Sequence, residues 1–401
     1  SGSDFASDLK LLHRAEIVDL CNDEAARISD QSFSNFLIKY VFVEEKIIPL
    51  STMIETCFQM NKSRTIEACN ILLSVFSDQS VREYVETQIN IVWDKLESDA
   101  EKFLPFFKAF HMVRPTKTLL LLQEYIEQET YHPFDVSTLP FDDNQQGKNV
   151  SDDILQILSG FENYSELPTA LDLLLLYYQK RPDLFEQFYR VYAERFEVNL
   201  DSPRFGYFTQ TAVVKNLCEA VNAAPEDRNL LILFVRVAGR FLKLDVSKAE
   251  GGRRNTVSFY TLTLSPDQPV LEYRKMLWSQ LYQIYQRGAV QDEIEQILYR
   301  YGMPCYNVDA GLDVVRAEFE DVLKFFDLFR LENLFHCVIA AHIKQVAKRI
   351  NYSELDILAP FLNSGKYKIY SGKSLQTCGA IHTSGYRWFD PSVFGELPDF
   401  R

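Results

Sequence analysis

Apolar residues recur along most of this chain at steps of three and four positions, which is the spacing of an amphipathic helix. The clearest case runs from Tyr164 to Phe196 and predicts two antiparallel helices joined by a turn at 180–182. In the first helix, residues 173–178 are all apolar. A helix without a polar face is buried among neighbours. We therefore expect near-complete burial of 173–176 and further helices stacked on both sides, as in a helical-repeat array.

The same periodicity predicts such helices before and after this pair. They cover residues 4–20, 33–45, 49–60, 64–76, 80–96, 98–110, 114–129, 206–223, 226–243, 266–285, 290–301, 311–328 and 330–350. In the helix over 226–243, the stripe of Leu230, Phe234 and Phe241 leaves Arg236 and Arg240 pointing away from the core. The predicted fold is all-α, an array of stacked helix pairs (an α-solenoid) similar to tetratricopeptide (TPR) repeats. Because the helix pairs share no fixed consensus, the predicted array is a divergent one.

Three segments break the helical pattern. Residues 132–152 contain prolines, a glycine and no period, which is typical of a linker or a functional loop. Residues 246–264 place Gly251-Gly252 between two extended runs and predict a β-hairpin. The predicted domains are an N-terminal helical array over 1–131, a linker over 132–152, a TPR-like array over 153–350 that carries the hairpin, and an irregular or β-stranded tail over 351–401.

The composition favours a well-packed intracellular protein. The 401 residues are 47% hydrophobic, with 30 Phe and 21 Tyr, which supplies a large core. A formal net charge of −14 repels a phosphate backbone, so we expect no nucleic-acid partner. Seven cysteines without a CxxC pair favour reduced thiols and a cytoplasmic location. No apolar run reaches 18 residues, so we expect no membrane partner.

The chain begins with Ser1-Gly2-Ser3 and no methionine. We interpret this start as the mark of a piece excised from a larger protein. Any oligomerisation is then expected to come from regions outside the fragment.

Two motifs in the tail bear on enzyme chemistry. Gly372-Lys373-Ser374 matches the end of a phosphate-binding loop, but position 367, where the motif needs glycine, is tyrosine. Cys378 and His382 lie four residues apart, and Asp390 is the nearby group that would orient them. A zinc site needs more ligands than this pair supplies. A solvated turn and packed side chains account for both motifs more simply, although the Cys/His pair remains the basis of an enzyme alternative.

Other titratable groups fit structural roles better than catalytic ones. His336 and His342 lie six positions apart on one predicted helix and do not share a face. His342 falls on the apolar stripe, so we expect a hydrogen-bonded core histidine. The acidic pairs 142–143 and 152–153 lie in the linker, without an apolar pocket to shift their pKa values. The sequence therefore predicts no catalytic, cofactor-binding or metal-binding residue.

Two basic and aromatic groups of residues are candidates for partner binding. The tail interleaves cations with aromatic rings, a composition that is enriched in binding hot spots. The tip of the predicted hairpin adds a basic projection. The candidate partner-binding residues are Lys366, Tyr367, Lys368, Tyr370, Lys373, Arg387 and Trp388 in the tail and Arg253 and Arg254 in the hairpin. Ordinary surface for the hairpin, and packing of the tail against the last helices, are the alternatives.

The order of elements from 154 to 340 resembles the C-terminal helical-repeat region of bacterial STAND-type NTPases, including antiviral ones. The resemblance covers less than half of the chain. Leu271, Arg274 and Trp278 meet a loose L-x-x-R-x-x-x-W pattern in part. The segments that carry the resemblance are LPTALDLLLLYYQKRPDLFEQFYRVYAERF, LLILFVRVAGRFL, GGRRNTVSFYTLTL and LEYRKMLWSQLYQIY.

In that family, the C-terminal array senses a phage protein and releases autoinhibition of an NTPase module. The resemblance thus implies a non-enzymatic sensor that recognises a protein partner, such as a phage protein, without a cofactor of its own. A general helical scaffold or adaptor is one alternative function, and an enzyme domain with the Cys378/His382 site is the other.

Overall fold

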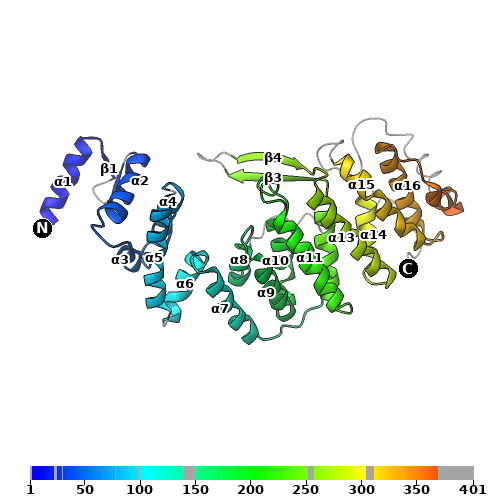
Figure 1. Cartoon of the computed structure of the whole chain (residues 1–401), viewed down its shortest axis with the longest axis horizontal. Helices are drawn as coiled ribbons and strands as arrows, with labels where there is room; N and C mark the ends of the chain where they lie inside the picture. The colour runs from blue at the N-terminus through cyan, green and yellow to red at the C-terminus, as the bar shows by residue number, and fades with distance from the viewer. Residues whose placement is uncertain are drawn as a thin grey trace. The chain divides into compact units, whose positions relative to one another are not determined.

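Two compact units make up the chain. A computed structural model describes residues 2–21, 25–28, 30–76, 78–97, 99–139, 150–251, 257–303 and 311–368. Unit 1 comprises residues 1–131 and 149–180, and unit 2 comprises residues 132–148 and 181–401. The chain therefore leaves unit 1 after residue 131, contributes a short segment to unit 2, returns to unit 1 and then completes unit 2 (Figure 1).

Unit 1 is mostly helical, with a short β-hairpin after its first helix. Its elements are α1 (Gly2–Arg14), β1 (Val18–Cys21), β2 (Ala25–Ile28), α2 (Gln31–Lys39), the π-helical turn η1 (Tyr40–Glu44), α3 (Leu50–Cys57), α4 (Lys62–Ser74), α5 (Gln79–Leu96), α6 (Ala100–Phe110), the 3₁₀ turn η2 (His111–Val113), α7 (Pro115–Gln128), α8 (Asp153–Ser159) and α9 (Leu167–Lys180).

The core of unit 1 is aromatic at its centre. Trp93 on α5 is fully buried and meets Phe103, Phe106 and Phe107 of α6 in edge-to-face contacts, with ring centroids 5.4, 6.3 and 5.6 Å away. Such contacts add to the hydrophobic gain of burying the rings. Helix α3 packs on α4 and α5, and α9 packs on α7 and α8. Most of the apolar run of α9 is buried, although Leu176 is only half-buried.

The hairpin of β1 and β2 is a departure from the predicted helix over 4–20. The helix ends at Arg14, and Glu16 takes a left-handed conformation with φ of 59°. The chain then pairs antiparallel from Val18↔Ile28 to Cys21↔Ala25. A count of apolar spacing does not register a single left-handed residue, so the sequence prediction extended the helix through this reversal.

Unit 2 is also mostly helical and contains a β-hairpin. Its elements are the 3₁₀ turn η3 (Val136–Thr138), η4 (Pro182–Leu184), α10 (Phe185–Arg190), the π-helical turn η5 (Val191–Arg195), α11 (Phe208–Ala223), α12 (Arg228–Phe241), β3 (Asp245–Gly251), β4 (Val257–Thr263), α13 (Gln268–Gln286), α14 (Gln291–Arg300), α15 (Leu312–Leu323), η6 (Lys324–Asp327), α16 (Leu334–Arg349), η7 (Asp356–Leu358) and α17 (Ala359–Leu362).

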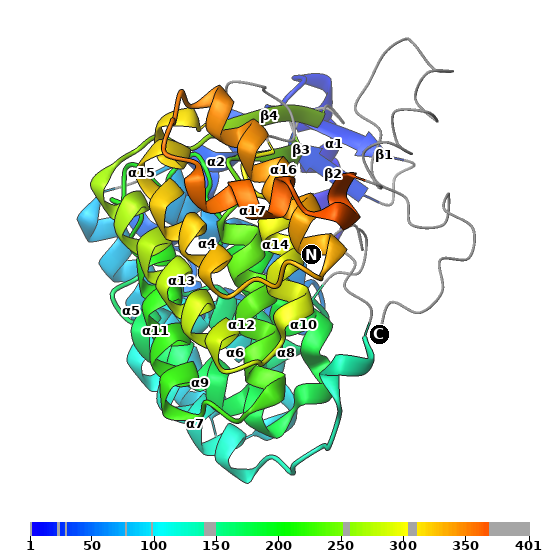
Figure 2. The same ribbon diagram turned by 90° about the vertical axis from the view of Figure 1, so that its right-hand side faces the viewer.

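The helices of unit 2 stack in two layers. Helix α13 lies between α11 and α15 in one layer, and α12, α14 and α16 follow one another in the second layer, with α10 beside α12. Each helix thus contacts its successor but one, and consecutive helices from α11 to α14 also touch across the layers. Figure 2 shows the layers edge on, with α11, α13 and α15 to the left of α12, α14 and α16. The expected all-α architecture is confirmed for the described residues.

Helix α12 occupies the centre of this arrangement. It contacts α10, α11, α13, α14 and η3, and every residue from Leu230 to Ala238 is buried. The buried set includes Arg236, which the sequence analysis predicted to point away from the core. That prediction was wrong because it assumed one exposed face, whereas neighbours cover α12 on all sides. Arg240 is partly buried and pairs with Glu197 at 2.6 Å.

The predicted hairpin over 246–264 is present. Strands β3 and β4 pair antiparallel from Asp245↔Thr263 to Gly251↔Val257. Val246 and Leu264 at its base are buried, so the hairpin is anchored to unit 2 where it leaves α12 and enters α13.

Two segments that lack a helical period in the sequence are ordered by packing. Residues 132–139, which we call the strap, dock on α12 instead of forming a free linker. In the predicted irregular tail, η7 and α17 are helical, a correction explained by burial of Leu358 and Phe361. The Phe361 ring packs 5.5 Å from that of Phe326. Residues 369–401 lie outside the described residues.

The boundaries of the units differ from the predicted division at 132–152. Helices α8 and α9 were assigned to the second array, whereas the compact unit that contains them is unit 1. No helix of the described residues is both long and apolar enough to cross a membrane.

Candidate functional site

The structure places three of the predicted partner-binding residues. Lys366, Tyr367 and Lys368 lie together on a helical turn after α17, with both lysines exposed and the tyrosine half-buried. The Lys366 ammonium donates to the carbonyl oxygen of Glu332 at 2.6 Å, and the Tyr367 backbone N–H donates to the Ser364 hydroxyl at 3.2 Å. The remaining predicted residues, Arg253, Arg254, Tyr370, Lys373, Arg387 and Trp388, lie outside the described residues.

The enzyme alternative falls in the same part of the chain. Cys378, His382 and Asp390 lie outside the described residues, as does Gly372-Lys373-Ser374. Within the described residues, no group of three or more His, Cys, Asp or Glu side chains is arranged to hold a metal ion.

The two histidines of α16 contact different parts of unit 2, as their six-residue spacing predicts. His342 Nε2 lies 2.6 Å from the carbonyl oxygen of Tyr301. Because a carbonyl only accepts, this nitrogen carries the proton. His342 is thus hydrogen-bonded, as predicted, although it is half-buried and not fully enclosed in the core. Burial lowers its pKa, opposed by the Tyr301 carbonyl, and the charge of Arg349 lowers it further.

This histidine predicts an acid sensitivity of unit 2. In the unfolded chain the imidazole titrates near its usual pKa of about 6.5, whereas in the folded chain it stays neutral to lower pH. The unfolded state therefore binds more protons below about pH 6.5, and the free energy of unfolding falls as the pH falls. We expect urea unfolding of unit 2 between about pH 7 and pH 5 to show this fall, with a shallower slope for His342→Gln. An equal or steeper slope in the variant would contradict the assignment.

His336 belongs to a buried triad with Glu295 and Tyr285. Oε1 of Glu295 accepts from the Tyr285 hydroxyl at 2.8 Å and lies 2.9 Å from Nε2 of His336. Nδ1 of His336 accepts the backbone N–H of Arg330 at 2.8 Å, so the imidazole is neutral and its proton sits on Nε2. The exposed fractions are 3%, 7% and 3% for Tyr285, Glu295 and His336. The triad has the residue types of an acid–base site but is sealed from substrate, and it ties α13, α14 and α16 together.

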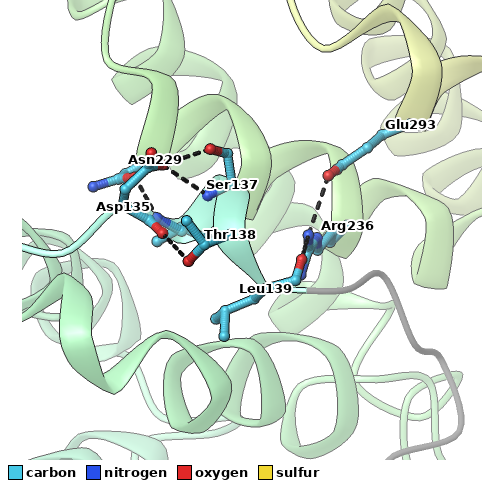
Figure 3. A network of polar contacts seen from close by, with 8 residues as sticks. Asp135, Ser137, Thr138, Leu139, Asn229, Arg236 and Glu293 are labelled. Atoms are coloured by element: carbon cyan, nitrogen blue, oxygen red, sulfur yellow. Dashed lines mark hydrogen bonds and ion pairs between the residues drawn. The ribbon is translucent and has the colours of Figure 1, made fainter.

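A second polar cluster lies on α12, where the strap docks (Figure 3). The side-chain amide of Asn229 donates to the carbonyl oxygen of Phe134 at 2.8 Å and accepts the backbone N–H of Val136 at 3.0 Å. The Asn229 side chain is thus hydrogen-bonded to the strap backbone on either side of Asp135. Asp227, the N-cap of α12, accepts from the Leu230 N–H at 3.0 Å and fixes the start of the helix that presents Asn229.

Arg236 lies two turns further along α12 and contacts three elements. Its Nη2 donates to the carbonyl oxygen of Leu139 at 2.9 Å and to Oε1 of Glu293 at 3.1 Å. The guanidinium also stands 5.1 Å from the ring centroid of Phe185, a cation–π distance. One buried cation therefore links the strap, α14 and α10.

The strap itself is folded into a turn by local hydrogen bonds. Oδ1 of Asp135 accepts from the Ser137 N–H at 3.0 Å and from the Ser137 hydroxyl at 2.6 Å, and the Thr138 hydroxyl donates to the Asp135 carbonyl at 2.7 Å. The hydrogen bonds from Ser137 hold the pKa of the exposed Asp135 carboxyl below its usual range. The carboxylate thus caps η3 as an anion at neutral pH.

Sequence reasoning missed Asn229 and misplaced Arg236. A signal was present for the arginine, because it interrupts the apolar run LLILFVRVAGRFL at a position that a core helix would fill with an apolar residue. No local pattern marks Asn229, whose strap partners Phe134 and Val136 are more than 90 positions earlier in the chain. Taken together, Asn229 and Arg236 offer hydrogen bonds to a peptide backbone.

The chain was compared with protein-family models, with curated proteins and with solved structures, and none matches it.

Proposed function

We propose that this chain is a non-enzymatic protein-recognition module, the sensor region of a larger bacterial STAND-type NTPase that acts in the cytoplasm. The two-layer stacking of helices in unit 2 carries the proposal. An array in which each helix contacts its next neighbour but one extends by repetition and presents a long surface to a folded partner. In the proposal this array is a divergent TPR-like α-solenoid, and the partner is a protein such as a phage protein.

The surface of unit 2 at residues 366–368 supports a binding role. The buried groups that combine acid and base side chains, such as Tyr285, Glu295 and His336, are closed to solvent and serve packing. By contrast, Lys366 and Lys368 are exposed on either side of the half-buried Tyr367, and the Lys366 ammonium also donates to the carbonyl oxygen of Glu332. Exposed cations next to an aromatic ring have the composition of a partner-binding surface.

The test is capture of phage structural proteins by the full chain. We expect one such protein to be retained, and its retention to fall about tenfold in the double variant K366E/K368E, because charge reversal removes an attraction at the contact. K344E/K348E is the matched control, since both lysines are exposed on α16 and the change in net charge is the same. Retention of no phage protein across a broad panel contradicts the sensor proposal, and equal loss in both variants contradicts the assignment of the lysines.

A further inference from the structure

The strap is held to α12 mainly by contacts to its main chain. Asn229 bonds the carbonyl of Phe134 and the N–H of Val136, and Arg236 bonds the carbonyl of Leu139. An amide that donates to one residue and accepts from the next but one imitates the edge of a neighbouring β-strand, a recurrent way to hold an extended peptide. Contacts of this kind accept many sequences, because every residue except proline offers the same main-chain groups.

Side-chain selectivity is confined to a few positions of the strap. Val136 is fully buried, Phe134 and Leu139 are half-buried, and Asp135 and Thr138 face solvent. The anchors therefore follow a Phe-x-Val-x-x-Leu spacing, with Asp135 and Ser137 closing the turn between them. This pattern of few apolar anchors and a bonded backbone is that of a bound peptide.

If the strap left α12, the buried cation of Arg236 would still have a charge partner. Arg236 keeps its bond to Glu293 and its position over the Phe185 ring, so no uncompensated cation is left behind. Leaving a buried charge without a partner would be strongly destabilising. Loss of the strap would therefore not leave Arg236 as an unpaired buried charge.

We infer that the face of α12 carrying Asn229 and Arg236 is a peptide-binding groove, filled in this structure by the chain's own strap, and that it receives from a partner protein a short segment with the same Phe-x-Val-x-x-Leu anchors. The strap competes with that segment from within the chain. An internal ligand tethered at both ends acts at a millimolar effective concentration, so the groove opens only to a partner segment that binds well or is itself presented at high local concentration. This inference does not depend on a phage partner or on the NTPase context.

The experiment uses the full chain and a fluorescein-labelled peptide of strap sequence, residues 132–139, followed by fluorescence anisotropy. In the V136D chain the strap loses its buried anchor while the α12 groove is unchanged. We expect the peptide to bind V136D at least about tenfold more tightly than the wild-type chain, because the internal competitor is weakened. A peptide that itself carries V136D is the matched control and should not bind.

A second substitution locates the binding on α12. Adding Asn229→Leu to the V136D chain keeps the side-chain size but removes both backbone bonds, and peptide affinity should fall about tenfold or more. Circular dichroism verifies that each variant is folded. Should V136D fail to fold, F134A/L139A loosens the strap through its half-buried anchors and serves in its place. Absence of peptide binding to a folded strap variant, or binding that Asn229→Leu leaves unchanged, overturns the inference.

Discussion

Replacing Arg274 with methionine is expected to lower the free energy of unfolding of unit 2 by about 3–5 kcal/mol, the usual cost of removing one partner of a buried ion pair. Arg274 on α13 is fully buried, and its Nε and Nη2 lie 2.7 and 2.6 Å from the two carboxylate oxygens of Glu318 on α15. The methionine would fill much of the space but leave the carboxylate of Glu318, which is 4% exposed, without its cation.

The same guanidinium also closes the end of α12. Its Nη1 donates to the carbonyl oxygens of Phe241 and Lys243 at 3.0 and 3.2 Å, and its Nη2 donates to that of Leu242 at 3.1 Å. The five N–H donors of Arg274 are therefore all used, two on Glu318 and three on carbonyls that a helix end leaves without a partner. Methionine supplies none of these donors.

Urea unfolding with hydrogen exchange measured on peptides of α13 separates the loss in unit 2 from events in unit 1. Lys275→Met is the matched control, because Lys275 is the exposed neighbour on the same helix, and it should change the free energy of unfolding by less than about 0.5 kcal/mol. The double variant R274M/E318M should recover part of the loss, since no buried charge remains. A loss in R274M no larger than in the lysine control would contradict this account of the ion pair.

Arg274 also marks the limit of periodicity as a guide to the core. The sequence predicted Leu271, Leu277, Trp278, Leu281 and Tyr285 for the buried face of α13; the last four are buried, whereas Leu271 is only half-buried. The arginine between the apolar positions gave no sign of burial, because its partner Glu318 lies 44 residues away. Pairings between distant elements depend on tertiary packing, which a local pattern does not contain.

The strap also shows that local sequence patterns do not reveal contacts between distant segments. Residues 132–152 lack a period, so the sequence allowed a linker or a functional loop and favoured the linker. Residues 132–139 of this segment are held by Asn229 and Arg236, which local composition does not connect to them. The β-hairpin of unit 2 was predictable because Gly251-Gly252 and the Thr- and Val-rich runs are local signals. Of the predicted partner-binding residues, the described ones form one exposed turn at 366–368, and their role stays a prediction.

Leu174→Ala is expected to lower the free energy of unfolding of unit 1 by about 2–5 kcal/mol, the range for deleting a fully buried leucine side chain. Leu174 on α9 has no exposed surface, and α9 packs against α7 and α8. Its helix is further held by the Tyr177 hydroxyl, which donates to Oδ2 of Asp152 at 3.0 Å. A backbone held in this way limits collapse around the missing side chain, so the substitution leaves a cavity and the loss falls in the upper part of the range.

Leu176 supplies a control of the same residue type on the same helix. The sequence predicted burial of all four leucines from 173 to 176; Leu173, Leu174 and Leu175 are 5%, 0% and 9% exposed, but Leu176 is only half-buried. Because solvent already reaches its side chain, Leu176→Ala should cost less than about 1.5 kcal/mol. Urea unfolding followed by hydrogen exchange in α9 measures both variants. Equal losses would mean that intrinsic helix propensity, which the two substitutions change alike, stabilises α9 more than its packing does.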